Sequence, residues 1–266
     1  MALPDDPARG VDGATAHEID DGEWYVVGDA AAVLEAYDGT AAIAFLDDAW
    51  ARPGRTEQGG LAYDLHPFDD RLVRATDGDD VDDSVTTTRI LDACREVLAP
   101  GGWLVADADD WLAPRLVEYL RREWGDAAAD PDGGGFRRLG GVTYLDADGR
   151  PDCDTHGDRL STAGYTVVFG HDGPTDRRTD AAARQVATWP TATYGRGGRA
   201  KPIGPYEAWI AGLVDPGEPI LVPCAGTAPA AIAAKRVFGD EARYVCIDVD
   251  PDAYDAFHER YADAID

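Results

Sequence analysis

Lysine is almost absent from this sequence, since only Lys201 and Lys235 occur among its 24 basic residues. Cysteine is scarce as well, and its four copies lack the paired spacing that indicates a disulfide framework or a structural zinc site. No apolar run approaches the roughly 18 residues that a transmembrane helix needs, and the polar, acidic start does not resemble a signal peptide. We therefore expect a cytoplasmic protein with reduced thiols, without a membrane segment and without a bound metal.

Positive charge is also in short supply overall. The 51 acidic residues against 24 basic ones give a net charge of −27, which excludes a nucleic-acid module recruited by bulk charge. The hydrophobic fraction of 44% and the seven tryptophans exclude a disordered acidic tail. Acid is spread along the whole chain, mostly as Asp, which favours a halophilic surface over a surface for a cationic partner. In molar salt the Debye length is about 3 Å, so a negative protein can still approach a polyanion.

Patterns typical of strands and helices alternate along the chain. Apolar runs predict strands at 24–27, 41–46, 103–106, 142–145, 165–170, 220–222 and 244–247. Apolar residues at helical spacing predict one helix that ends near Tyr37 and others at 84–98, 113–124, 206–214, 228–238 and 251–264. This alternation predicts an α/β protein whose open, largely parallel sheet is covered by helices on both faces.

The ends of the predicted strands carry the first candidate site, because α/β sheets bind ligands at the carboxyl ends of their strands. The strand at 220–222 leads into a turn of small residues in which Gly226 allows the backbone to approach a ligand. The next strand ends in Asp248, a position from which a carboxylate accepts ribose hydroxyls in nucleotide-binding units. The pair favours a nucleotide-like ligand over a purely structural turn.

Two other strand ends carry candidates that are ambiguous when taken alone. Asp47 and Trp50 follow the strand at 41–46, and a carboxylate beside an aromatic ring can hold a flat ring that bears an amine. The alternative is a solvated strand end. Gly28 and Asp29 follow the strand at 24–27 and are equally consistent with a helix cap.

In combination these motifs resemble the AdoMet-dependent DNA amino-methyltransferases, in the permuted order with the catalytic tetrad before the AdoMet motif. In that family a Gly-Asp pair precedes a tetrad of Asp, Asn or Ser, two prolines and an aromatic residue. L-x-P-G-G before a strand, a variable region, Lys-Pro at a helix start, a glycine turn and a strand-end acid follow. The matching segments here are Gly28-Asp29, Asp47–Trp50, VLAPGGWLV from Val97, Lys201-Pro202, CAGTA from Cys224, and Asp248.

The resemblance implies a Rossmann-like class I methyltransferase fold with a mostly parallel, seven-stranded sheet. It implies a single domain over 1–266, with a variable, DNA-contacting insertion at 125–200. The implied cofactor is S-adenosyl-L-methionine, whose adenine amine Asp29 would hold and whose ribose Asp248 would hold, with Gly226 beside the methionine end. The full set of implied cofactor contacts is Asp29, Lys201, Pro202, Cys224, Ala225, Gly226, Thr227 and Asp248.

The implied reaction is methyl transfer to the exocyclic amine of a base flipped out of double-stranded DNA, as in restriction-modification systems. Asp47 and the backbone carbonyl of Asp48 would accept hydrogen bonds from the amine, and Trp50 would stack on the base. A tetrad that begins with Asp favours adenine N6 over cytosine N4. Both prolines of the tetrad are replaced here, so the alternative is a catalytically weakened or inactive protein that still binds AdoMet and DNA.

A third interpretation, an unrelated nucleotide-dependent enzyme such as a dehydrogenase, is disfavoured because too little chain follows the glycine turn for a full dinucleotide fold.

One local cluster of basic residues is a candidate for DNA binding. Residues 177–201 hold six basic residues and one acid, a local charge of +5 in an acidic chain. We expect a loop that follows the phosphates rather than structural ion-pair partners. The predicted DNA contacts are Arg52, Arg55, Arg177, Arg178, Arg196 and Arg199; a monomer and a homodimer are both left open.

Overall fold

The structure, a computed structural model, describes residues 3–47, 87–110, 112–130, 132–152, 162–188, 192–195 and 200–265. Its strands are β1 (Thr15–Asp20), β2 (Glu23–Val27), β3 (Ala41–Leu46), β4 (Leu98–Ala108), β5 (Gly135–Leu145), β6 (Gly164–His171), β7 (Arg184–Thr188), β8 (Ile220–Pro223) and β9 (Tyr244–Asp248). Its helices are α1 (Ala30–Glu35), α2 (Thr87–Val97), α3 (Ala113–Glu123), α4 (Gly204–Leu213), α5 (Pro229–Phe238), the short 3-10 helix η3 (Gly239–Glu241) and α6 (Pro251–Ile265).

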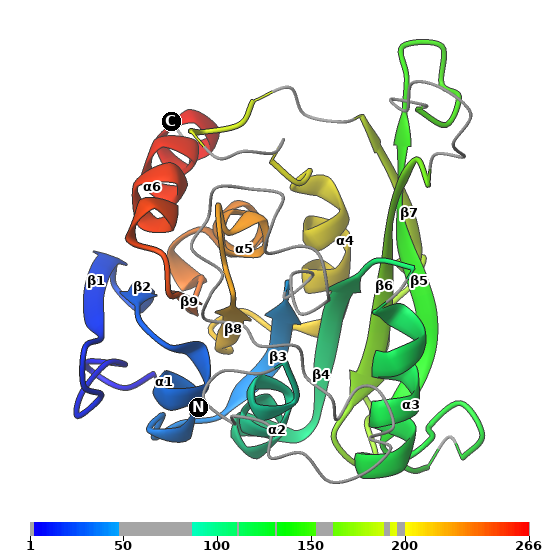
Figure 1. The fold of residues 1–266 in the computed structure, drawn as a ribbon, viewed down its shortest axis with the longest axis horizontal. Helices are drawn as coiled ribbons and strands as arrows, with labels where there is room; N and C mark the ends of the chain where they lie inside the picture. The colour runs from blue at the N-terminus through cyan, green and yellow to red at the C-terminus, as the bar shows by residue number, and fades with distance from the viewer. Residues whose placement is uncertain are drawn as a thin grey trace, which may run out of the picture.

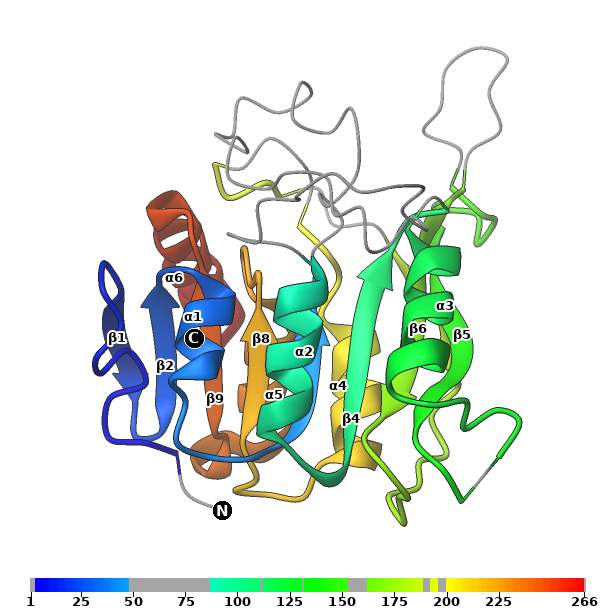
Figure 2. The ribbon, with the colours of Figure 1, turned by 60° about the horizontal axis from the view of Figure 1, so that its bottom comes forward.

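Within the described residues, nine strands form one sheet in the order β1-β2-β9-β8-β3-β4-β6-β5-β7. The five neighbours from β2 to β4 are parallel, so their carboxyl ends meet at one edge of the sheet, the upper edge in Figure 2. β6 is antiparallel to both β4 and β5, and β7 pairs with β5 in parallel. The sheet is thus mostly parallel, as the sequence predicts.

The expected number of seven strands is wrong, because β1 and β7 add one strand at each edge of the sheet. Neither edge strand contains a buried residue, and β7 alternates between exposed and half-buried positions along RQVAT. Strands of this kind carry no apolar run, since only one side of them packs against the protein. The segment 125–200, expected as an insertion, supplies β5, β6 and β7 and so forms one end of the sheet.

Helices cover both faces of the sheet, with α1, α2 and α3 on one face and α4, α5 and α6 on the other (Figure 1). The central strand β3 is buried at every position. Ala41, Ala44 and Leu46 pack with the first group of helices, whereas Ile43 and Phe45 pack with the second. Burial on both faces explains why the sequence shows a continuous apolar run here rather than an alternating one.

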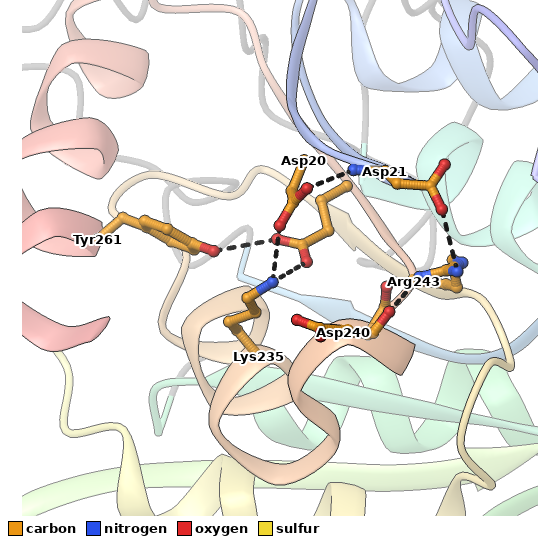
Figure 3. A network of polar contacts seen from close by, with 8 residues as sticks. Asp20, Asp21, Lys235, Asp240, Arg243 and Tyr261 are labelled. Atoms are coloured by element: carbon orange, nitrogen blue, oxygen red, sulfur yellow. Dashed lines mark hydrogen bonds and ion pairs between the residues drawn. The ribbon is translucent and has the colours of Figure 1, made fainter. Parts of the chain in front are cut away.

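A polar network ties the β1–β2 hairpin to α5 and α6 at the amino-terminal end of β2 (Figure 3). Lys235 Nζ lies 2.8 Å from Glu23 Oε1 and 3.0 Å from Asp20 Oδ2, and the Tyr261 hydroxyl donates to Glu23 Oε2 at 3.1 Å. Glu23 is only 1% exposed, so this network satisfies a buried carboxylate. Lys235 therefore has a structural role.

Cys94, Cys224 and Cys246 are free thiols, and Cys153 lies outside the described residues. Among the residues that the structure describes, no helix is long and apolar enough to span a membrane. In the same residues, no cluster of three or more His, Cys, Asp or Glu side chains is suited to a metal ion.

Candidate functional site

Polar residues gather at the carboxyl edge of the parallel strands. Asp47 directly follows β3, Asp107 lies near the end of β4, and Asp248 ends β9. The turn Cys224–Ala228 connects β8, the strand between β9 and β3, to α5. The fold therefore brings the predicted catalytic acid and the predicted cofactor turn to one edge, where sheets of this type bind ligands.

Lys201 joins two of these acids. Its Nζ atom lies 2.6 Å from Asp47 Oδ2 and 2.7 Å from Asp107 Oδ2. The Asp107 side chain is 4% exposed, whereas the Asp47 side chain is 35% exposed and so can meet a ligand. We call Asp47, Asp107 and Lys201 the acid–lysine cluster; with both acids ionised, it carries one uncompensated negative charge.

Two tyrosines complete the inner side of the acid–lysine cluster. The Tyr206 hydroxyl donates to Asp107 Oδ2 at 2.5 Å, and the Tyr165 hydroxyl donates to that of Tyr206 at 3.3 Å. Lys201 Nζ also lies 4.7 Å from the centre of the Tyr165 ring, within range of a cation–π contact. The other oxygen of Asp107, Oδ1, is buried and has no hydrogen-bond partner among the described residues.

Burial and the neighbouring charges have opposite effects on the pKa values of Asp107 and Lys201 in the acid–lysine cluster. Burial raises the pKa of Asp107 to about 6, against the opposing pull of the Lys201 ammonium. Burial alone would lower the pKa of Lys201, but the adjacent Asp107 and Asp47 outweigh it and hold that pKa above its usual value. Lys201 thus stays charged, while Asp107 is the member that can take up a proton near neutral pH.

The turn after β8 has an unusual backbone. Cys224, Gly226 and Ala228 have φ angles of 56°, 52° and 43°, in the left-handed region that favours glycine. A Cβ atom added to Gly226 would have no atom within 4 Å, so open space lies beside the backbone here. Strained residues of this kind collect at ligand sites, and left-handed turns expose backbone N–H groups to anions.

Asp248 fixes this turn to the neighbouring strand. The Gly226 amide donates to Asp248 Oδ2 at 2.7 Å, and the Asp250 amide donates to Asp248 Oδ1 at 3.0 Å. From the other side, the Tyr25 hydroxyl donates to the Gly226 carbonyl at 2.8 Å. The sequence-predicted pair is therefore in direct contact.

Arg260 of α6 connects the turn to the Lys201 segment. Its Nη1 atom donates to Thr227 Oγ1 at 2.8 Å, and its Nη2 atom donates to the Lys201 carbonyl. The guanidinium carbon lies 5.8 Å from the centre of the Tyr194 ring. Arg260 is 3% exposed, and burial lowers its pKa.

Asp29 follows β2 at the same edge and caps α1, because its Oδ1 atom accepts from the Ala32 amide at 2.6 Å. Its Oδ2 atom is buried and lacks a hydrogen-bond partner in the described part of the chain. The two interpretations of this position are thus compatible, since one oxygen caps the helix and the other is left for a donor.

Several predicted residues lie outside the described part of the chain. These are Asp48 and Trp50 of the tetrad and the arginines Arg52, Arg55, Arg196 and Arg199. Pro202, which follows Lys201 in the chain, is buried, and Ala225 is buried in the turn.

The segment 177–201 does not form one continuous loop, because it contains the strand β7, which pairs with Gly141–Leu145 at the carboxyl-terminal part of β5. Arg177 lies at the amino-terminal edge, where Nη1 and Nη2 each lie 2.6 Å from a carboxylate oxygen of Glu218. Arg178 is next to it, is exposed and donates to the Thr175 carbonyl. Both lie away from the acid–lysine cluster, and Arg177 has the structural ion pair that the sequence interpretation disfavours.

A cavity of about 720 Å³ lies between α1 and α2, also toward the amino-terminal edge. It is lined in part by Glu35, Tyr37, Arg89 and Asp92, and Arg89 forms an ion pair with Glu35 at 2.7 Å. None of the predicted site residues lines it, so we place the functional site at the carboxyl edge instead.

Sequence reasoning missed Asp107, Tyr206 and Arg260. Asp107 and Asp109 follow the run WLVA and look like a loop, and the available signal was that Asp107 comes directly after a predicted strand. Arg260 lies on the inner side of α6, four residues after the buried Ala256. That helical spacing was the signal for a buried arginine.

The architecture has clear counterparts among solved structures, although no family model and no curated protein matches the sequence. A crystal structure of M1.HpyAVI is 11% identical, with a TM-score of 0.58 over 89% of this chain and 96% of that one. The cytosine-N4-specific PvuII DNA methyltransferase is 12% identical, with a TM-score of 0.57 over 91% of each chain.

TTHA0409, a modification methylase from Thermus thermophilus, is 17% identical, with a TM-score of 0.55 over 91% of this chain and 94% of that one. Structures with S-adenosyl-L-methionine exist for M1.HpyAVI and for TTHA0409, with TM-scores of 0.54 and 0.52. Identities this low carry information on the fold alone. The mixed sheet with helices on both faces, which matches these structures over nearly the whole chain, is the class I methyltransferase fold.

Proposed function

We propose that this protein is an AdoMet-dependent methyltransferase that modifies the exocyclic amine of a base in double-stranded DNA. The observation that carries the proposal is the juxtaposition at one sheet edge of a partly exposed carboxylate, Asp47, with the strained turn at Gly226 and the acid Asp248. The motif order is that of the permuted members of the family, and the fold matches a DNA methyltransferase named for cytosine N4.

The proposed cofactor site offers groups that suit AdoMet. Open space beside Gly226 lets a ligand approach the backbone, and Asp29 Oδ2, which has no partner among the described residues, can accept from the adenine amine. Asp248 can accept from the ribose hydroxyls. Cys224, Ala225, Thr227, Lys201 and Pro202 would surround the methionine part. When bound, AdoMet supplies an electrophilic methyl group on its sulfonium.

The acid–lysine cluster would orient the target amine. A base flipped from the duplex brings its exocyclic amine to Asp47, which accepts a hydrogen bond and directs the nitrogen lone pair toward the methyl group. Lys201 holds Asp47 Oδ2, so among contacts with described residues the Oδ1 atom remains open to the amine. Asp48, through its carbonyl, and Trp50, through stacking, keep the roles that the resemblance implies. An Asp in the first tetrad position favours adenine N6 over cytosine N4.

The DNA would contact the carboxyl edge, at which Lys201 lies. We assign the phosphate contacts to Arg52, Arg55, Arg196 and Arg199 and leave out Arg177 and Arg178, which lie at the other edge. The double variant Arg196→Glu/Arg199→Glu should lose DNA binding in an electrophoretic shift while AdoMet binding is unchanged. Retention of DNA binding would remove this segment from the interface.

Transfer of tritium from labelled AdoMet to unmethylated DNA in molar KCl tests the reaction. We expect incorporation by the wild type and a loss of about 100-fold or more in Asp47→Ala, because an oriented hydrogen bond to the reacting group is removed. Asp132→Ala, an exposed acid away from the cluster, is the matched control and should keep full activity. Nucleoside digestion then separates N6-methyladenine from N4-methylcytosine. AdoMet binding without incorporation over many DNA sequences would instead establish the inactive binding protein.

A further inference from the structure

Among the described residues, Arg260 is a buried cation without an anionic partner. It is 3% exposed, yet in the described part of the chain no carboxylate forms an ion pair with it. Its partners are neutral oxygens of Thr227 and of the Lys201 backbone, with the ring of Tyr194 nearby. Buried charges in proteins are normally paired, because an uncompensated charge in a medium of low dielectric constant is strongly unfavourable.

The position of Arg260 indicates which kind of anionic group could pair with it. Its guanidinium bridges Thr227 of the turn and the carbonyl of Lys201, two segments that border the proposed methionine end of the cofactor. Nη1 and Nη2 each carry two N–H groups, and the contacts above do not use all of them. A guanidinium with free N–H groups is the preferred partner of a carboxylate.

The surrounding charge points the same way. Asp47, Asp107 and Asp248 are acidic, and Lys201 is already shared between two of them. This edge would therefore repel the one anionic group of AdoMet, its carboxylate, unless a further cation is present. Arg260 is the cationic residue among the described side chains that form hydrogen bonds with the turn, through Thr227.

We propose that Arg260 binds the carboxylate of the amino-acid part of AdoMet and so selects ligands that carry it. The inference rests on the proposed function. It adds a residue from the last helix to the cofactor site, and it gives Thr227 and the Lys201 carbonyl the role of fixing the guanidinium.

Calorimetric titration of the full chain in molar KCl with AdoMet and with decarboxylated AdoMet, which lacks only the carboxylate, tests this assignment. The wild type should bind AdoMet about 10- to 100-fold more tightly, the range of a charge-assisted hydrogen bond. Arg260→Met should lose that preference, with weaker AdoMet binding and nearly unchanged binding of the decarboxylated compound. Arg260→Lys should keep part of the preference. Arg236→Met, at an exposed arginine of α5, is the matched control and should bind like the wild type.

The outcomes separate the two levels of the proposal. If the wild type binds neither compound, the proposed function fails. If the wild type binds both compounds equally, Arg260 does not recognise the carboxylate, whatever the variants do. If Arg260→Met lowers the affinity for both ligands by the same factor, the residue only stabilises the turn, and the proposed function stands without this contact.

Discussion

Replacing Asp107 with asparagine removes a buried negative charge while it keeps the shape of the side chain. The pKa of Asp107 is raised from 3.8 to about 6, a value that already includes the attraction of Lys201. A difference of about two units corresponds to about 3 kcal/mol, because each unit is worth about 1.4 kcal/mol. We therefore expect Asp107→Asn to be more stable than the wild type by up to about 3 kcal/mol at pH 7, while methyl transfer falls because Lys201 loses a partner.

The effect on stability depends on pH, because the pKa of Asp107 differs between the folded and the unfolded state. A raised pKa means that the folded state holds more protons than the unfolded state between about pH 4 and 6, so the stability of the wild type falls across that window. The variant lacks this group. The difference in unfolding free energy should be near zero at pH 4, grow up to pH 6 and stay constant above it.

Urea unfolding followed by tryptophan fluorescence at a series of pH values measures this difference. Asp20→Asn is the control: Asp20 is exposed, and the hydrogen bond from Lys235 lowers its pKa, so that variant should lose rather than gain stability. A destabilised Asp107→Asn at pH 7, or a difference that does not vary between pH 4 and 6, would refute the argument that the charge of Asp107 is costly in the folded state.

Three further predictions concern single contacts. Arg177→Met should lower the unfolding free energy by about 3 kcal/mol in a urea titration, because it leaves Glu218 partly buried without its cation, whereas Arg178→Met next to it should change stability by less than about 0.5 kcal/mol. Arg178→Glu should leave DNA affinity in an electrophoretic shift unchanged, since the residue lies at the opposite sheet edge; a clear loss would return it to the interface. Asp29→Ala should lower the unfolding free energy by about 1 kcal/mol, because the cap of α1 is lost, and should weaken AdoMet binding in calorimetry. If the variant binds AdoMet with the affinity of the wild type, Asp29 Oδ2 does not contact the ligand.

The strand bounds that the sequence predicts most closely belong to strands that are buried on both faces. The run at 41–46 is β3 with the same bounds, and the predicted acid of β9 is indeed bonded to the predicted glycine of the turn. Local sequence suffices here because a parallel central strand must be apolar throughout and must end at the ligand edge. The AdoMet contacts assigned to these residues stay predictions.

The elements and contacts that the sequence does not reveal depend on distant partners. The apolar run predicts that β4 ends at 106, but the strand continues to Ala108 and buries Asp107. Aspartate is disfavoured in strands, and the groups that pair with this buried carboxylate, Lys201 and Tyr206, come more than 90 residues later in the chain. Likewise the basic residues at 177–201 look uniform in sequence, and only the ion pairs of Arg177 with Glu218 and of Lys201 with Asp47 show that the two ends of this segment lie at opposite ends of the parallel strands.

The scarcity of lysine acquires a physical meaning in the structure. Both lysines are largely buried, and each places one nitrogen between two carboxylates: Lys201 between Asp47 and Asp107, and Lys235 between Asp20 and Glu23. A compact ammonium can donate in several directions from one atom, whereas the planar guanidinium spreads its donors over a fork that suits a single carboxylate. Arginine can replace lysine on an acidic surface, where geometry is free. At these two positions geometry is fixed, so lysine remains, and one of the two holds the proposed catalytic acid.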